Sequence, residues 1–354
     1  MTTGCDIPYS VAGPMVRFSD QRSGCRRWLT LLACGLALSG AACGGSGGST
    51  PSGPVTITAG YSNVSADDLS AWVAADGGIF KKNGLDVNLT LVSGGSRTMA
   101  ALLSGEIQIS QQGGSEALAS TAGGASLVVL ATLAPVYPYK FEVQGSIQSP
   151  ADLKGKKVGV SSVGGSADVA TRVALPRIGI DPEKDVTIVA VESHANRTAA
   201  LYSGAIAGAV DDPPDSVGLE AKGLHPLVDL ASLKLPAANT VVVVQRSWLN
   251  GHRDAAQKYV DSIVEAIARM KKDRAFTISV LKKYFNSNDD KAMDVAYDFF
   301  TSEVTPSQPY PRVEQWADTQ RYLGQKNSKI GTVNINTMID PSFVKSAVDR
   351  GLDK

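Results

Sequence analysis

Two Gly-Gly-Ser turns, at residues 94–96 and 113–115, constrain the fold of this chain more than any other feature. Residues 85–91 alternate apolar and polar side chains before the first turn, which is typical of a strand with one packed face. The first turn opens a helix that Gly105 ends, and Ile107 begins the strand that leads to the second turn. A strand, a glycine turn and a helix start therefore follow one another twice. This order favours a parallel sheet with both turns at one edge.

Turns of this kind form natural binding sites. The first amides of a helix have no partner within the helix, and the helix dipole adds partial positive charge at the same end. An anion or a polar ligand group is therefore stabilised there. Each turn taken alone is equally well interpreted as a tight connection between a strand and a helix. Taken together, the two turns indicate a ligand-binding edge and no catalytic cluster.

A third loop is expected at the same edge of the sheet. Residues 55–59 read as a strand, and the loop at 61–65 separates it from a helix whose buried stripe begins at Leu69. Ser65 and Asp68 have the spacing of a capping box, so we expect Ser65 to cap that helix. The loop joins the two glycine turns beyond the carboxyl ends of parallel strands, which is where ligands bind in such sheets.

The same arrangement recurs further along the chain. Val158 and Val160 predict a strand, and a glycine turn at residues 161–166 opens another helix. Residues 100–107, AALLSGEI, also match residues 199–206, AALYSGAI, and each copy ends a helix and starts a strand. Two lobes of similar construction explain this match. Coincidence is the alternative, because helices commonly end in a small residue and glycine.

Acidic and aromatic side chains supply further candidate site residues. Asp211 and Asp212 end a strand of the second unit, where their carboxylates can accept hydrogen bonds from an amine, a hydroxyl or a ring N–H. The alternative is that one of them caps a helix ahead of Pro213. Tyr137 and Tyr139 either line a pocket or pack on the core.

The N-terminal segment has the features of an export signal. All four cysteines lie in the first 43 residues, which excludes disulfides and cysteine metal sites from the rest of the chain. Arginines precede an apolar run, and small residues then lead to Cys43, which resembles a bacterial lipoprotein signal. We expect a signal peptide at residues 1–42, lipidation of Cys43 and a flexible tether at residues 43–54. Gly40 replaces the leucine usual at its position, and Cys34 is the alternative lipidation site.

Composition excludes several classes of function. The 34 basic residues balance the 34 acidic residues, so no basic field points to a nucleic acid. His194, His225 and His252 show no metal-ligand spacing, and we interpret each as an ordinary surface or loop residue. The chain has no phosphate-binding Gly-x-x-x-x-Gly-Lys motif, so ATP hydrolysis would belong to a separate subunit. We therefore expect no metal, no cofactor and no nucleic-acid partner.

Six short motifs occur in order along the chain: AWVA at 71–74, GIFKKNGLDV at 78–87, GGS at 94–96, LLSGEI at 102–107, DLKGKKV at 152–158 and GIDP at 179–182. They resemble the nitrate-, sulfonate- and taurine-binding proteins of ABC transporters, a group that includes thiamine-pyrimidine binders. The similarity extends from about Thr56 to the last helices. It implies an α/β, two-lobed type II periplasmic-binding fold with parallel-type sheets flanked by helices. Two hinge strands would join the lobes, which would close on a ligand like a clamp.

Runs of strand-forming residues at 140–143 and 240–244 are the expected crossings between the lobes. We therefore expect lobe 1 at residues 55–143 and 244–354, with the C-terminal helices buttressing it, and lobe 2 at residues 147–240. The expected ligand-binding residues are Tyr61, Ser62, Ser65, Gly95, Ser96, Gly114, Ser115, Tyr137, Ser162, Gly165, Ser166, Asp211 and Asp212.

The resemblance implies the solute-binding component of an ABC importer, exported and lipid-anchored to the outer face of the bacterial cell membrane or held in the periplasm. Its ligand would be a small organic anion or zwitterion of sulfonate, taurine, aromatic carboxylate or pyrimidine type. Relatives often carry an uncharged pair before the double proline, so Asp211-Asp212 argues against a simple inorganic anion. The expected partners are this ligand, permease and ATPase subunits, and the membrane through the lipid anchor, with the chain itself a monomer.

Two other functions fit the same fold. One is a sensor that presents its ligand to a membrane receptor. The other is an enzyme, since residues 113–117 vaguely resemble a nucleophile elbow for which His194 could be the base. Fungal pyrimidine synthases of similar fold use a cysteine-rich iron motif, and no cysteine follows Cys43. We therefore expect a binding protein and not an enzyme.

Overall fold

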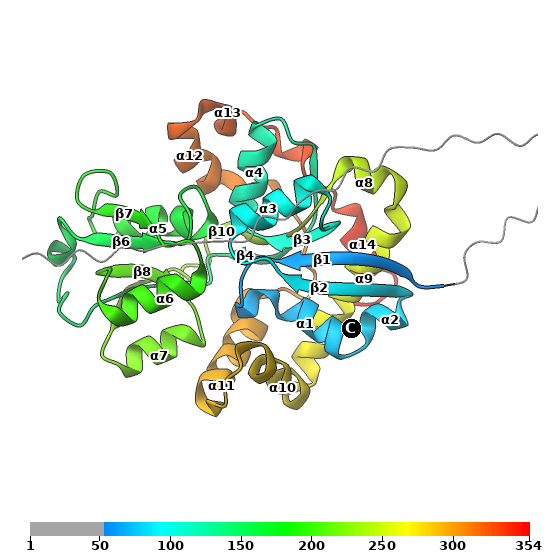
Figure 1. Cartoon of the computed structure of the whole chain (residues 1–354), viewed down its shortest axis with the longest axis horizontal. Helices are drawn as coiled ribbons and strands as arrows, with labels where there is room; N and C mark the ends of the chain where they lie inside the picture. The colour runs from blue at the N-terminus through cyan, green and yellow to red at the C-terminus, as the bar shows by residue number, and fades with distance from the viewer. Residues whose placement is uncertain (1–52) are drawn as a thin grey trace, which may run out of the picture. The chain divides into compact units, whose positions relative to one another are not determined.

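The computed structural model describes residues 53–354. The expected signal peptide, Cys43 and residues 43–52 of the expected tether lie outside the described residues. The described part forms two lobes, each built on a five-stranded sheet with helices packed around it (Figure 1). The two-lobed α/β fold expected from the sequence is confirmed.

The first sheet has the strand order β2-β1-β3-β10-β4. β1 (Val55–Tyr61) is parallel to β2 (Leu85–Leu91) and to β3 (Ile109–Gln112). β10 (Pro236–Gln245) lies between β3 and β4 (Leu127–Val136) and is antiparallel to both. The three parallel strands are those that the glycine turns predict, because their helical crossovers place the turns at one edge.

The second sheet repeats this design with the order β7-β6-β8-β5-β9. β6 (Lys157–Val160) is parallel to β7 (Thr187–Ala190) and β8 (Gly208–Asp211). β5 (Lys140–Val143) is antiparallel to β8 and to β9 (His225–Asp229). Each sheet therefore has a parallel trio, one inserted antiparallel strand and a fifth strand, which accounts for the internal sequence match.

The expected crossing strands both need correction. Residues 140–143 were expected to cross between the lobes as the end of lobe 1, but they form β5 inside the second sheet. Residues 240–244 were also expected to cross, but they lie in β10, whose whole length belongs to the first sheet. The chain crosses instead at residues 137–139 and 230–235, between strands. A run of β-branched residues predicts a buried strand, but it does not say which sheet supplies the hydrogen-bond partners.

Helices cover both sheets. Those before β5 and after β10 are α1 (Leu69–Asp76), α2 (Ile79–Lys82), α3 (Gly95–Ser104), α4 (Gly114–Ala122), α8 (Arg246–Gly251), α9 (Arg253–Lys272), α10 (Arg274–Phe285), α11 (Asp290–Phe299), α12 (Ala317–Lys326), α13 (Ser328–Gly331) and α14 (Ser342–Asp349). Those between the crossings are α5 (Ser166–Arg177), α6 (His194–Ser203) and α7 (Asp215–Ala221). No helix among residues 53–354 is long and apolar enough to cross a membrane.

The C-terminal helices support lobe 1, as the sequence predicts, but one of them also reaches lobe 2. α9 packs on α1, and α14 packs on α9 and β4. α12 packs on β10 of the first sheet and on α5 of the second lobe. Trp316, just before α12, is fully buried in a hydrophobic cluster that contains residues of both lobes.

The second sheet contains a buried acid with no local partner. Glu142 lies on β5 between β8 and β9, its side chain is fully buried, and neither carboxylate oxygen has a hydrogen-bond partner among the described residues. Burial raises the pKa of Glu142 to about 8, with Glu220 adding to the shift, Lys140 opposing it and Asp211 adding to it. Glu142 therefore favours the uncharged form in the folded protein.

This shift predicts a pH-dependent effect of Glu142→Gln. An acid whose pKa is raised on folding contributes most below its unfolded pKa, near 4.5, and this contribution is lost as the pH rises to about 8. We therefore expect Glu142→Gln to raise the free energy of unfolding by roughly 2–4 kcal/mol at pH 8 and to change it little at pH 5. Urea unfolding at both pH values measures this, with Glu106→Gln at an exposed site as the control. An equal effect of Glu142→Gln at pH 5 and pH 8 would show that Glu142 has no raised pKa.

Candidate functional site

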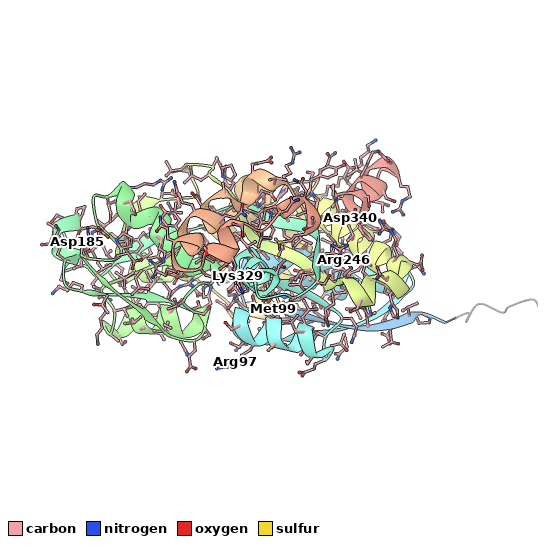
Figure 2. All side chains as sticks on the ribbon, turned by 90° about the horizontal axis from the view of Figure 1, so that it is seen from above. Arg97, Met99, Asp185, Arg246, Lys329 and Asp340 are labelled. Atoms are coloured by element: carbon pink, nitrogen blue, oxygen red, sulfur yellow. The ribbon has the colours of Figure 1, made fainter. Side chains whose placement is uncertain are left out.

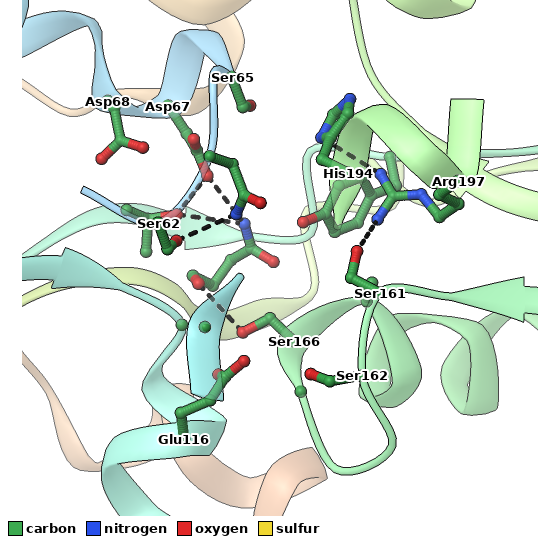
Figure 3. Close-up of a pocket in the computed structure, with 18 residues that line it drawn as sticks. Ser62, Ser65, Asp67, Asp68, Glu116, Ser161, Ser162, Ser166, His194 and Arg197 are labelled. Atoms are coloured by element: carbon green, nitrogen blue, oxygen red, sulfur yellow. Dashed lines mark hydrogen bonds between the residues drawn. The ribbon is translucent and has the colours of Figure 1, made fainter. Parts of the chain in front are cut away.

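A small enclosed cavity lies between the two lobes, where the loops after the parallel strands face each other (Figure 3). The space that the centre of a water-sized sphere can occupy in it is about 40 Å³. Its lining residues are Ser62, Asn63, Ser65, Asp67, Asp68, Gly95, Gly113, Glu116, Tyr139, Ser161, Ser162, Gly165, Ser166, Ala167, His194, Arg197, Asn239 and Thr240.

Both lobes and the hinge contribute to this lining. The loop after β1, the turn before α3 and the turn before α4 form the wall from lobe 1. The turn between β6 and α5 and the first turn of α6 form the wall from lobe 2. Asn239 and Thr240 come from β10 beside the hinge. The cavity thus lies beyond the carboxyl ends of the parallel strands, where the sequence predicts a ligand.

Hydrogen bonds close the cavity by joining one lobe to the other. The Ser65 hydroxyl donates to Asp212 Oδ1 at 3.3 Å. The hydroxyls of Ser115 and Ser166 lie 3.1 Å apart. At the outer rim, Arg97 Nη2 lies 3.3 Å from Glu192 Oε2, and Figure 2 shows Arg97 at the boundary between the lobes. The expected capping box is wrong, because Ser65 accepts no capping hydrogen bond and its hydroxyl is used between the lobes.

Six of the expected ligand-binding residues line the cavity: Ser62, Ser65, Gly95, Ser162, Gly165 and Ser166. The other seven, Tyr61, Ser96, Gly114, Ser115, Tyr137, Asp211 and Asp212, are not among the lining residues. Ser115 and Asp212 remain close, since they bond to the lining residues Ser166 and Ser65. Gly114 lies against the hinge instead, where an added Cβ would come within 2.5 Å of the Ala238 carbonyl oxygen.

The two expected tyrosines face away from the cavity for identifiable reasons. Tyr61 packs edge-on against Trp72, with ring centroids 5.8 Å apart. The Tyr137 hydroxyl donates to Asp318 Oδ2 at 3.4 Å, in the region where lobe 1 packs on α12. For Tyr139, the sequence allowed either a place on a pocket wall or a place in the core. In the structure Tyr139 lines the cavity and is nearly fully buried. Alternation of two tyrosines along a loop does not reveal which one faces the ligand side.

Sequence reasoning missed Arg197 and interpreted His194 as an ordinary surface or loop residue, or as the base of the enzyme alternative. Both are buried, with exposed fractions of 6% and 2%, because they lie on the inner face of α6 one helical turn apart. His194 Nε2 lies 3.2 Å from Asp211 Oδ1 and 3.0 Å from Asp215 Oδ2. Arg197 donates to Ser161 Oγ at 3.0 Å and has Nη2 at 3.7 Å from Asp211 Oδ1. The i, i+3 spacing of two basic residues is the signal that sequence reading overlooked.

These contacts determine the charge states of His194 and Asp211. Burial and Arg197 lower the pKa of His194, but Asp211 and Asp215 outweigh them and raise it to about 10. Burial raises the pKa of Asp211, but His194 and Arg197 outweigh it and the result is a lowered pKa. Asp211 is therefore ionised and is held by two cations. The Thr198 hydroxyl donates to Asp211 Oδ2 at 2.9 Å and also favours the ionised form of Asp211.

The acidic residues on the opposite wall have no such partners. Asp67 Oδ2 accepts hydrogen bonds from the Thr240 hydroxyl and from Asn239 Nδ2, and burial raises the pKa of Asp67. Burial and the neighbouring Asp67 raise the pKa of Asp68 well above its usual range. On the lobe 2 side, burial likewise raises the pKa of Asp212 strongly, although the nearby His194 opposes the shift. Asp67 and Asp68 follow the expected loop 61–65 after one residue, but Asp68 had been assigned to a helix cap.

Glu116 occupies the corner where the glycine turns meet. An added Cβ at Gly95 or Gly113 would collide with the Glu116 carboxylate, and one at Gly165 would lie 2.8 Å from Glu116 Oε1. The Ser115 hydroxyl donates to Glu116 Oε2 at 2.9 Å. Burial raises the pKa of Glu116, whereas the Ser115 hydroxyl and the Ser166 backbone N–H lower it. The chain's own carboxylate therefore sits among helix N-termini that the sequence predicts as an anion site.

The expected enzyme alternative finds no support in this geometry. The Ser115 hydroxyl is bonded to Glu116 and lies next to Ser166, whereas His194 is directed at Asp211 and Asp215. A nucleophile elbow requires the base within hydrogen-bond reach of the hydroxyl. One group of described residues, His194, Asp211 and Asp212, has ligand atoms within 4.8 Å of one another. Arg197 already neutralises Asp211 there, so a metal ion would compete with a guanidinium.

Comparison with known proteins places the chain in a family. Residues 51–281, more than half of the chain, match the NMT1-like family. The chain belongs to the NMT1-like family. This confirms the resemblance seen in the sequence at the level of family and fold.

One curated relative and two solved structures illustrate the range of similar proteins. The putative binding protein YtlA of Bacillus subtilis (strain 168) is 23% identical over 281 residues, which cover 77% of this chain and 84% of YtlA. The periplasmic aliphatic sulphonate binding protein SsuA of Escherichia coli has a TM-score of 0.65 at 22% identity, covering 81% of this chain and 93% of SsuA. The desulfurization enzyme DSZB has a TM-score of 0.62 at 18% identity, covering 84% of this chain and 99% of DSZB. The two-lobed fold is thus shared by a binding protein and an enzyme.

Proposed function

We propose that this NMT1-like protein is the extracytoplasmic solute-binding component of an ABC importer, which captures a small organic ligand between its lobes and delivers it to a permease. The enclosed polar cavity between the lobes carries this proposal. Loops from both lobes and the strand β10 of the first sheet contribute to its lining. A ligand bound there would contact both lobes at once and so favour the closed arrangement, as in clamp-like binding proteins.

The proposed ligand is compact and polar. The centre of a water-sized sphere can occupy only about 40 Å³ of the cavity, which suits a ligand of few atoms or the head group of a larger one. Among the expected classes, which are organic anions or zwitterions of sulfonate, taurine, aromatic carboxylate or pyrimidine type, we favour those that carry N–H donors. The carboxyl groups of Asp67, Asp68 and Glu116 on the lining supply acceptors for such donors.

Ligand retention and transfer test this proposal. The full chain, purified from its own host, should retain a small molecule that native mass spectrometry detects. That molecule should raise the melting temperature of the chain by mass action, because it binds only the folded state. It should also be recovered unchanged after incubation with the protein, and the loaded protein should stimulate ATP hydrolysis by the cognate permease and ATPase. Chemical conversion of the molecule would favour the enzyme alternative, and no stimulation would favour the sensor.

We also propose that the chain is exported and held at the membrane by a lipid on Cys43. The sequence before Cys43 supports this, and those residues lie outside the described part of the structure. Detergent-phase partitioning of the full chain compared with Cys43→Ala measures the anchor. We expect the wild-type chain in the detergent phase and Cys43→Ala in the aqueous phase. Cys34→Ala is the matched control, and loss of the anchor in Cys34→Ala alone would assign lipidation to Cys34.

A further inference from the structure

We propose that the cavity selects its ligand by a cationic nitrogen group, which Asp68 and Asn239 hold by hydrogen bonds and whose charge Asp67 and Asp68 balance. This inference rests on the proposed ligand-binding function and adds the charge of the group that is recognised. Three independent features of the described residues support it: unpaired acceptors, an excess of carboxyl groups and an anion site that is already filled.

The unpaired acceptors point to hydrogen-bond donors on the ligand. Asp68 and Asn239 line the cavity with exposed fractions of 2% and 3%. Asp68 Oδ1 and Asn239 Oδ1 have no hydrogen-bond partner among the described residues. Figure 3 shows Asp68 beside Asp67 on the lobe 1 wall. Buried acceptors are normally paired, so two unpaired ones on the same cavity indicate that a ligand supplies the donors.

The carboxyl groups around the cavity outnumber the cations. His194 and Arg197 are the basic residues of the lining, and both are directed at acids on the lobe 2 side, Asp211 and Asp215. Asp67, Asp68, Asp212 and Glu116 form no ion pair with any described residue. A cation on the ligand would favour the ionised forms of these carboxyl groups and pair with them, whereas an anion would disfavour those forms.

Glu116 already fills the site that would otherwise attract an anion. Its carboxylate lies among Gly95, Gly113 and Gly165, at the N-termini of α3, α4 and α5. The amides and dipoles that stabilise negative charge are therefore directed at a group of the chain itself. A ligand that enters this closed cavity meets the acceptors of Asp68 and Asn239 instead.

A nitrogen cation explains the unpaired acceptors better than a metal ion does. The described residues with metal-ligand spacing are His194, Asp211 and Asp212, and this group contains neither Asp68 nor Asn239. It also lies beside the guanidinium of Arg197, 3.7 Å from Asp211 Oδ1. An ammonium or amidinium group carries several N–H donors, which can bond to Asp68 and Asn239 at the same time.

Matched pairs of small compounds test this inference on the full chain. Thermal shift and calorimetry at pH 7 would compare taurine with isethionate, ethylammonium with ethanesulfonate, and acetamidinium with acetamide. We expect the amine of at least one pair to raise the melting temperature by several degrees, and its partner to have little effect. Asp68→Asn should weaken binding of that amine at least tenfold, and Asn239→Ala should weaken it in the same direction. Asp86→Asn, at an exposed site of lobe 1, is the matched control and should bind like the wild type.

The outcomes separate this inference from the proposed function. The melting temperature of each unliganded variant shows whether it folds. If isethionate or ethanesulfonate binds and the amines do not, the protein is a solute-binding protein and the inference is wrong. Equal binding of the amine by wild type and Asp68→Asn would also overturn it. Stabilisation by Zn²⁺ alone, lost in Asp212→Asn and kept in Asp68→Asn, would replace the nitrogen cation by a metal. If native mass spectrometry finds a retained ligand without a basic nitrogen, the inference fails and the proposed function stands. If the chain retains no ligand and no compound of any charge binds, both proposals fail.

Discussion

Replacing Arg197 with methionine should lower the free energy of unfolding by about 3 kcal/mol, because it removes one of two cations from a buried carboxylate. Arg197 is 2% exposed, and its Nη2 lies 3.7 Å from Asp211 Oδ1. The change also removes the hydrogen bond from Arg197 to Ser161 Oγ. Methionine keeps most of the side-chain volume, so the loss reports charge and hydrogen bonding more than a cavity. Urea unfolding at pH 7 measures it.

Arg97→Met is the matched control for this prediction. Arg97 also pairs with an acid, Glu192, but the two side chains are 65% and 71% exposed. Exposed ion pairs contribute little, so Arg97→Met should change the free energy of unfolding by less than about 1 kcal/mol. If Arg97→Met and Arg197→Met lower the free energy of unfolding by similar amounts, the buried pair Arg197–Asp211 contributes no more to stability than the exposed pair Arg97–Glu192.

Trp72→Ala has the second large expected effect, a loss of about 3–5 kcal/mol in the free energy of unfolding. Trp72 is fully buried and stacks on Tyr284, with ring centroids 4.5 Å apart and an angle of 8° between the rings. It also meets Tyr61 and Phe285 edge-on. The smaller side chain leaves a cavity between α1, β1 and α10, which these aromatic rings cannot fill without moving.

This substitution should also weaken ligand binding. Asp67 and Asp68 form the short helical turn η1 (Ala66–Asp68), which runs directly into α1, so a shift of α1 moves both carboxyl groups. Trp248→Ala is the control, because Trp248 is only half-buried and stacks on His252 at the surface of lobe 1. Trp248→Ala should cost less than half as much stability and leave binding unchanged. Unfolding by urea and calorimetry with the retained ligand distinguish the two variants.

Local signals in the sequence were sufficient for most of the fold. Residues 85–91 alternate apolar and polar side chains and form β2. Gly105 ends α3 with a positive φ of 82°. Both features depend on neighbouring residues alone. The placement of β5 and β10 was not predictable in this way. Each of them lies between two strands that are far from it in the sequence. Its position therefore depends on hydrogen bonds to distant residues, which no local pattern encodes.

The candidate site likewise combines residues that local signals predict with residues whose positions depend on contacts between distant parts of the chain. The glycine and serine turns that line the cavity were found because turn chemistry is local. His194 and Arg197 were not found, because their function depends on Asp211, which the fold brings near from β8. Glu116 was missed for a related reason. It follows an expected turn directly, but its role depends on Gly95 and Gly165 from two other loops.

The insertion of lobe 2 between β4 and β10 has a consequence for the order in which the chain can assemble. All five strands of the second sheet lie within residues 140–229, so that sheet is complete in a single continuous segment. The first sheet is not, because β10, which joins β3 to β4, begins at Pro236 and β4 ends at Val136. When the chain is synthesised from its N-terminus, residues 140–229 are therefore the first segment that can complete all the hydrogen bonds of a sheet. The edges of β3 and β4 stay open until β10 arrives, and an exposed strand edge is the part of a nascent chain most prone to wrong pairing.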